Sequence, residues 1–145
     1  MQPYNKAFFG LYENIFTTYS KLHGAKEALE FMEDLFANGL GKAYLAAGFS
    51  KGNTDDFAKV VKERDESVGL HVEFPLITPK KIIYQFHQDP FPNLKNLVAW
   101  KKLDHTYMHF KVKYLLGDKW AYTTTQHIWE DHPFTEHVIY CLGEQ

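Results

Sequence analysis

Histidine is the side chain best suited to move protons or bind metals near neutral pH, and five of the chain's eight histidines lie between residues 104 and 142. His105 and His109 are four residues apart, a spacing that places both imidazoles on one face of a helix but separates them along a strand. No glutamate follows His105, so the pair lacks the zinc-protease motif in which a glutamate follows the first histidine. The spacing alone therefore favours histidines that are solvated or singly hydrogen-bonded.

A second set of candidate metal ligands comes from residues in expected strands. His71, Glu73, His87 and His127 would form a metal site with an open position if the strand registers brought them to one face. The same four residues would otherwise form an ordinary polar surface, and this is the interpretation that we adopt. We therefore predict no metal, and the sequence identifies no cofactor.

Acid–base catalysis is the other chemistry that these residue types allow. A histidine beside a carboxylate can act as a general base, and burial would raise the pKa of a carboxyl group toward neutral pH. The residues predicted to fill these roles are His127, Asp104, His105 and Glu73. The single cysteine, Cys141, lies in an apolar stretch and is more typical of a small core residue than of a nucleophile.

Aromatic residues are unusually frequent, at 17% of the chain. They supply large apolar surfaces, and tyrosine and tryptophan add a polar group at one end, so this composition suits either a bulky core or a ligand pocket. For a pocket, the predicted ligand-binding residues are Tyr84, Phe86, Trp100, Met108, Phe110, Tyr122, Thr125 and His127.

The first half of the chain is predicted to be helical, because its apolar residues recur at helical spacing. Gly24 and the pair Asn38-Gly39 are typical of helix ends, and Asn53 or Thr54 is a good N-terminal cap. Helices are therefore predicted over residues 3–22, 25–37, 41–48 and 55–66.

From Val68 the apolar residues alternate, which is typical of strands. Strands are predicted over residues 68–76, 81–87, 108–114 and 135–142, with a helix over 92–104 and a further strand after the Gly117-Asp118 turn. That turn would pair Met108 with His127. The alternative for residues 105–116 is a continued helix, which would carry apolar residues on nearly every side, so the strand is preferred.

This order of elements predicts an α+β fold, in which N-terminal helices pack on an antiparallel sheet of about five strands and one helix is inserted after the second strand. At 145 residues the chain fits a single domain, 1–145, with a helical part over 1–66 and a sheet part over 68–142.

Charge and hydropathy exclude several classes of partner. The formal net charge of -2 and the sequence pI near 6.4 give no basic patch for nucleic acid. No apolar stretch reaches 18 residues and no signal peptide is recognisable, so we predict no membrane partner and a cytoplasmic location.

The block from Lys81 to Cys141 contains a strand ending in the turn Asp89-Pro90-Phe91-Pro92, a helix ending in Leu103-Asp104-His105, and closing strands. In these features it resembles the L-2-amino-thiazoline-4-carboxylic acid hydrolase-like family and the related vinyl-reductase-type small-molecule-binding domains. Asp104 and His105 are the positions that carry over. Asp89 and Lys101-Lys102 stand near the positions of that family's cysteines, so the resemblance implies a ligand pocket between helices and sheet rather than the hydrolase reaction.

We therefore predict a small-molecule-binding domain of the sensor or carrier type, with an aromatic-lined pocket between helices and sheet. The alternative is a small hydrolase or isomerase that uses a histidine with an aspartate or glutamate, with or without a metal. The expected partner is a small-molecule ligand, and Trp100 and Trp129, if exposed, would anchor a homo-oligomer.

Overall fold

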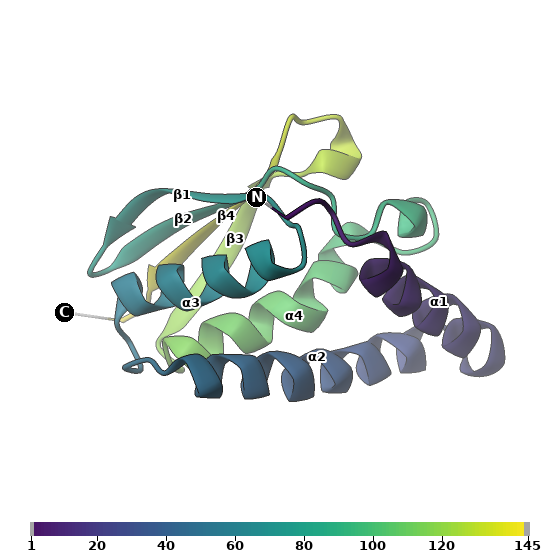
Figure 1. Ribbon diagram of the computed structural model, residues 1–145, viewed down its shortest axis with the longest axis horizontal. Coiled ribbons are helices and arrows are strands. Elements are labelled where there is room, and N and C mark those ends of the chain that lie inside the picture. The colour runs from purple at the N-terminus through teal and green to yellow at the C-terminus, as the bar shows by residue number, and fades with distance from the viewer. Residues whose placement is uncertain (1, 144–145) are drawn as a thin grey trace.

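The structure is a computed structural model that describes residues 2–143. Its elements follow the order α1 (Lys6–His23), α2 (Ala25–Ala47), α3 (Thr54–Ser67), β1 (Val72–Thr78), β2 (Lys81–Phe86), the 3-10 turn η1 (Pro92–Leu94), α4 (Trp100–Leu115), β3 (Trp120–Gln126), the 3-10 turn η2 (Ile128–Glu130) and β4 (Thr135–Cys141) (Figure 1). None of the helices within residues 2–143 is long and apolar enough to cross a membrane.

The strands form one antiparallel sheet in the order β1-β2-β4-β3, so β2 and β4 are central. Tyr84 on β2 pairs with His137 on β4, and Ile82 pairs with Ile139. All four side chains are fully buried, which identifies the face of the sheet that the helices cover. The predicted α+β class, with helices on an antiparallel sheet, is confirmed.

The helices lie on one side of this sheet in two tiers (Figure 1). α3 and α4 run along the sheet, and α2 lies beyond α4, where it also contacts α1. The side chains that fill the space between the tiers and the sheet form the core, and many of them are aromatic. Any pocket between helices and sheet must therefore be bounded by aromatic rings.

The largest correction concerns residues 100–115, which form one helix, α4, where a strand was predicted over 108–114. Its buried residues recur at helical spacing and are Leu103, Asp104, Thr106, Tyr107, Met108, Lys111, Val112 and Leu115. Two of these buried residues, Asp104 and Lys111, are charged, so the apolar residues by themselves do not mark a continuous buried face of a helix. The apparent alternation arises because Phe110 and Tyr114 lie on another side of the helix, where their rings stack with centroids 4.9 Å apart.

This helix changes the predicted sheet. The sheet has four strands rather than about five, and β3 pairs with β4 instead of with residues 108–114, so Met108 is not a strand partner of His127. The helix predicted over 92–104 starts too early, because Pro92–Leu94 forms only a 3-10 turn and α4 begins at Trp100, so that only residues 100–104 of the predicted range are in an α-helix. α4 is nevertheless a helix inserted after the second strand, as predicted.

Residues 25–47 form a single helix, α2, where two helices separated at Asn38-Gly39 were predicted. Glycine weakens a helix because it gains the most freedom on unfolding, but packing against a neighbouring element can override that preference. A Cβ atom at Gly41 would lie 3.3 Å from the ring of Phe110, so Gly41 allows α4 to pack closely against α2.

The first strand begins at Val72 rather than at residue 68. Val68 is the C-terminal cap of α3, and Gly69 turns the chain with φ of 84°, a left-handed conformation that favours glycine. The register of β1 against β2 shifts between Glu73 and Leu76, around Pro75. Proline has no backbone N–H to donate, so Pro75 is suited to this position, where β1 is both an edge strand and bulged.

Candidate functional site

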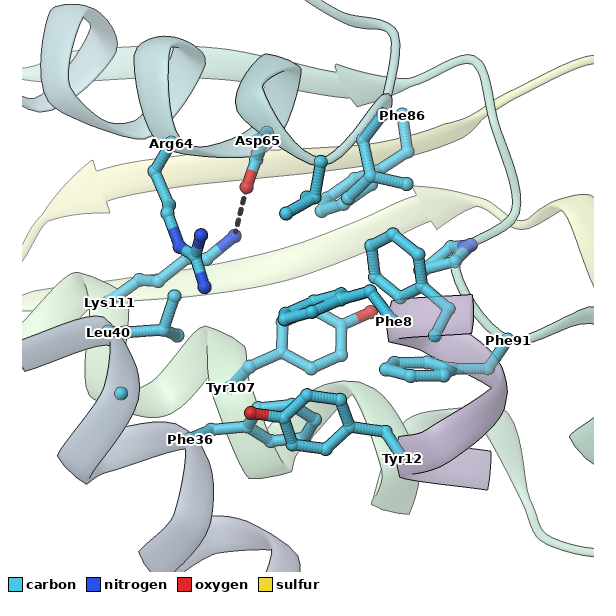
Figure 2. A pocket seen from close by; sticks show the side chains of 15 residues that line it. Phe8, Tyr12, Phe36, Leu40, Arg64, Asp65, Phe86, Phe91, Tyr107 and Lys111 are labelled. Atoms are coloured by element: carbon cyan, nitrogen blue, oxygen red, sulfur yellow. Dashed lines mark ion pairs between the residues drawn. The ribbon is translucent and has the colours of Figure 1, made fainter. Parts of the chain in front are cut away.

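A cavity lined mainly by aromatic residues lies where α1, α2, α3 and α4 meet the end of β2 (Figure 2). Its aromatic lining consists of Phe8, Phe9, Tyr12, Phe36, Phe86, Phe91 and Tyr107. The cavity volume is about 60 Å³. A water molecule needs roughly 10–15 Å³ on this measure, so the cavity has room for several waters or one small organic group.

A buried ion pair closes one end of this aromatic cavity. Lys111 reaches from α4 toward Asp65 on α3, with Nζ 3.5 Å from Oδ1, and both side chains are almost fully buried (Figure 2). Tyr84 on β2 completes the group, because its hydroxyl donates to Asp65 Oδ2 and accepts a hydrogen bond of 2.8 Å from Lys111 Nζ. Three elements thus hold one amine, one carboxyl and one phenol in contact.

Aromatic rings surround the Lys111 amine. Its nitrogen lies 5.1 Å from the ring centroid of Tyr84, 5.2 Å from that of Phe86 and 5.3 Å from that of Tyr107. Aromatic faces attract a cation at such distances, and the attraction is strongest where water is excluded. The protonated lysine therefore has favourable contacts other than its ion pair.

Burial disfavours the charged forms of both members of the ion pair. It lowers the pKa of Lys111, although the neighbouring Asp65 carboxylate acts in the opposite direction. It raises the pKa of Asp65, although Lys111 and the Tyr84 hydrogen bond act to lower it. Transfer of one proton from Lys111 to Asp65 would leave a neutral amine and a neutral carboxylic acid, which the buried environment accommodates.

A second cationic group, Arg64, lies beside the ion pair (Figure 2), and its charge acts on the pKa of both Asp65 and Lys111. Four lining residues are only partly buried and mark where the cavity approaches solvent: Phe8, Tyr12, Leu40 and Arg64. The guanidinium of Arg64 lies 5.4 Å from the ring centroid of Phe8. The cavity therefore has an aromatic part and, at one end, three charged groups close together: the buried Lys111 and Asp65 and the partly buried Arg64.

Gly39 lies in the middle of α2 and lines this cavity. A Cβ atom at Gly39 would have Tyr12 Oη, 3.9 Å away, as its nearest neighbour, so the space beside it is open. Glycine inside a helix costs about 1 kcal/mol relative to alanine. Because Gly39 has no side chain, it leaves open space in the wall of the cavity, and it makes α2 less stable than alanine would.

A second buried polar group forms around His127, which was predicted both as a catalytic and as a ligand-binding residue. Its Nε2 lies 3.1 Å from Asp104 Oδ2, and Tyr107 donates a hydrogen bond of 3.0 Å to Asp104 Oδ1. The backbone N–H of Trp129 donates to His127 Nδ1 at 3.0 Å, so Nε2 carries the proton and donates to Asp104. The structure thus brings together His127 and Asp104, two of the four predicted catalytic residues.

Little space adjoins this histidine. The cavity that His127 lines with Asp104, Asp89 and Trp129 has a volume of about 10 Å³, enough for one water. Burial raises the pKa of Asp89, which accepts a hydrogen bond of 2.7 Å from the indole of Trp129. Substrate access to His127 would require side chains to move.

The two tryptophans considered as interface anchors both make contacts within the chain. The ring of Trp100 stacks on His127 with centroids 4.5 Å apart, and its indole donates to Glu130 at 3.0 Å. Both tryptophans are partly buried, so neither is the fully exposed anchor that a homo-oligomer would use. The homo-oligomer stays a prediction.

The remaining predicted catalytic residues lie apart from His127. Glu73 is on the edge strand, 3.1 Å from His71 and 3.8 Å from His87, and His105 contacts Glu33 of α2 at 3.5 Å. His127 therefore does not share a face with His71, Glu73 and His87. Within residues 2–143, no three histidine, cysteine, aspartate or glutamate side chains are placed to hold a metal ion.

The predicted ligand-binding residues divide among several places. Phe86 lines the aromatic cavity, and Tyr84 contacts the Lys111 amine at its closed end. Trp100 and Tyr122 line a separate, more polar groove between α4 and β3. The other four lie elsewhere. His127 is in the buried group with Asp104, Met108 is fully buried in the core, Phe110 packs beside Gly41, and Thr125 is exposed and donates a hydrogen bond to Glu136.

The residues that the sequence did not single out are Asp65, Lys111, Arg64 and Gly39. The strand predicted over 108–114 would place Lys111 on the face opposite Met108 and Phe110, and its buried position follows only from the helix α4. One signal in the sequence bears on the buried position of Lys111. It lies seven residues after Asp104, so a helix would place these two charged residues two turns apart on one face.

No protein-family model matches the chain, and neither does any curated protein sequence. The resemblance to the L-2-amino-thiazoline-4-carboxylic acid hydrolase-like family therefore stays a prediction.

Proposed function

We propose that this protein binds a small, largely apolar molecule in the aromatic cavity between its helices and its sheet, as a sensor or carrier does. The observation that carries this proposal is the combination of an aromatic lining with a buried amine and carboxyl at one end. Ligand sites are typically apolar clefts with a few convergent polar groups that fix the orientation of the ligand.

The charges around the cavity favour an anionic ligand group. Arg64 and Lys111 carry positive charge, and Asp65 is the one acidic residue in the lining. If Lys111 and Asp65 neutralise each other, Arg64 beside them still leaves a net positive charge at this end of the cavity. A short-chain carboxylate would place its apolar part among the rings and its carboxylate near this end.

The cavity volume limits the size of the ligand. About 60 Å³ suits a short acyl chain, whereas a ring system would require partly buried side chains such as Phe8 to move. Small ligands gain at most about 1.5 kcal/mol per non-hydrogen atom, and only the best reach this bound. Dissociation constants in the micromolar to millimolar range are therefore expected.

An acid–base enzyme that uses His127 with Asp104 is the second candidate. The 3.1 Å contact between the two side chains favours it, because the carboxylate would orient the imidazole. The adjoining space of about 10 Å³ admits a water but no substrate. The geometry therefore supports ligand binding in the aromatic cavity better than catalysis at His127.

A thermal-shift panel tests the binding proposal. We expect butanoate and hexanoate to raise Tm, and butylamine to have little effect because the site is positively charged. At ten times Kd a ligand stabilises the folded state by about 1.4 kcal/mol, which for a chain of this size raises Tm by roughly 3–6 °C.

Butanamide and sodium chloride at equal concentration are the controls for the charge and for ionic strength. A panel in which butylamine raises Tm as much as butanoate would contradict the proposed charge preference. A panel in which none of the compounds raises Tm, from short acyl chains to benzoate, would contradict the binding function.

A further inference from the structure

We infer that Lys111 forms an imine with a small aldehyde or ketone held in the aromatic cavity. This inference rests on the proposed binding function and identifies the class of ligand that would react there. It follows from the position of the amine, from the groups that can take and return its proton, and from the rings that would surround the product.

The amine is placed where a bound carbonyl group would meet it. Lys111 lines the aromatic cavity and is 3% exposed, and it is the only lysine that is buried within residues 2–143. An exposed lysine, with a pKa near 10.4, is neutral in only about one molecule in 10³ at pH 7. Burial lowers the pKa of Lys111 and so increases the fraction that is a nucleophile.

Asp65 and Tyr84 supply the proton transfers that imine formation needs. Asp65 Oδ1, 3.5 Å from Nζ, accepts a proton from the ammonium and leaves a neutral amine. The nitrogen lone pair then attacks the carbonyl carbon, and the oxygen takes a proton from the Tyr84 hydroxyl, which Asp65 reprotonates. This step forms a carbinolamine.

Loss of water completes the reaction. The carbinolamine nitrogen, which still carries two protons and a positive charge, first gives one proton to the Asp65 carboxylate. Asp65 passes this proton to the carbinolamine hydroxyl, which leaves as water, and the freed nitrogen lone pair forms the C=N bond. The nitrogen's remaining proton returns to Asp65 or stays on the imine. Overall, one amine and one carbonyl compound give one imine and one water, and nothing is oxidised or reduced.

The surroundings also suit the product. A protonated imine is a cation at the position of the lysine ammonium, so it keeps the contacts with the rings of Tyr84, Phe86 and Tyr107 and with the Asp65 carboxylate. Condensation therefore replaces one buried cation by another and leaves no charge without a partner.

Reductive trapping on the full-length protein tests this inference. The protein is incubated at pH 7 with butanal and sodium cyanoborohydride, which delivers a hydride to the imine carbon and fixes the adduct as a secondary amine. We expect peptide mapping by mass spectrometry to find Lys111 labelled more than about tenfold faster than any exposed lysine, because the cavity would hold the aldehyde beside its amine. Butanoate should slow labelling at Lys111 only.

Two variants are the controls for this experiment. Lys111→Arg keeps the positive charge beside Asp65 but cannot form an imine, so the fast label should disappear. Lys102→Arg, which removes an exposed lysine of the same helix, should leave the label at Lys111 unchanged.

Binding of butan-1-ol and butanoate, measured by calorimetry, separates failure of this inference from failure of the proposed function. If these compounds bind but butanal labels Lys111 no faster than the exposed lysines, the imine is excluded and the binding function stands. If they do not bind and Lys111 is not labelled, both are overturned.

Discussion

The Asp65→Ala variant is expected to lose about 3–5 kcal/mol of its free energy of unfolding, because removal of one partner from a buried ion pair leaves the other buried without compensation. Lys111 would keep only its hydrogen bond to the Tyr84 hydroxyl and its aromatic contacts, and Tyr84 would lose the acceptor for its own hydroxyl. Denaturation in urea at pH 7 measures the loss.

Two further variants show whether the loss comes from burial of the charge. Glu66→Ala breaks the exposed Lys62–Glu66 contact of 3.4 Å in the same helix and should cost no more than about 1 kcal/mol. Asp65→Leu combined with Lys111→Met removes both charges and should recover most of the stability lost in Asp65→Ala. A cost in Asp65→Ala as small as that of Glu66→Ala would contradict a charged pair in the core.

Acidification is expected to destabilise the protein through His137. Its side chain is fully buried among aromatic rings, with Thr124 Oγ1 2.9 Å from Nδ1, and Nε2 has no partner among the described residues. Burial lowers its pKa from 6.5 to about 4, and the charges of Asp104, Lys111, His127 and Glu136 modify this effect. At mildly acidic pH, His137 is therefore protonated in the unfolded chain but stays neutral in the folded protein.

The direction in which the free energy of unfolding changes with pH follows from this lowered pKa. The stabilising contribution of neutral His137 is complete above pH 6.5 and is lost as the pH falls toward about 4. With 1.36 kcal/mol per pKa unit, the loss between pH 7 and pH 5 is about 2 kcal/mol. Unfolding free energies from urea denaturation at the two pH values measure it.

The His137→Leu variant isolates this contribution, since leucine can occupy the apolar site and does not titrate. The wild-type protein should lose about 2 kcal/mol more than His137→Leu between pH 7 and pH 5. His23→Gln, at the exposed end of α1, should behave like the wild type. Equal pH dependence in the wild type and His137→Leu would show that His137 becomes protonated in the folded state.

Local patterns in the sequence predict most of the fold correctly because their physical causes are local. Asn5 and Asn53 accept hydrogen bonds from the first turns of α1 and α3, and the alternation in residues 81–87 and 135–142 corresponds to β2 and β4. These features depend on caps and on one buried face, both of which are visible in a short segment.

The candidate site was less predictable because its main residues break the local rules. Lys111 and Asp65 are charged residues in the core, and each is stabilised by a partner more than forty positions away in the sequence. Gly39 is a glycine in the interior of a helix, where a helix end was the reasonable prediction. Only the tertiary structure shows that α2, α3 and α4 bring these three positions to one cavity.

The most direct test of the binding proposal is to fill the cavity at Gly39 and measure affinity. A leucine side chain at this position would extend into the open space beside Tyr12, and leucine is a better helix former than glycine, so the fold should be retained. Gly10→Leu is the matched control, because Gly10 is a helical glycine of α1 with open space around it and outside the cavity lining.

Calorimetric titration with butanoate should give similar dissociation constants for the wild type and Gly10→Leu. For Gly39→Leu we expect Kd to rise at least about tenfold, the equivalent of 1.4 kcal/mol, because the side chain occupies the ligand's place. Unchanged affinity in Gly39→Leu would show that butanoate binds elsewhere and would contradict the assignment of this cavity as the binding site.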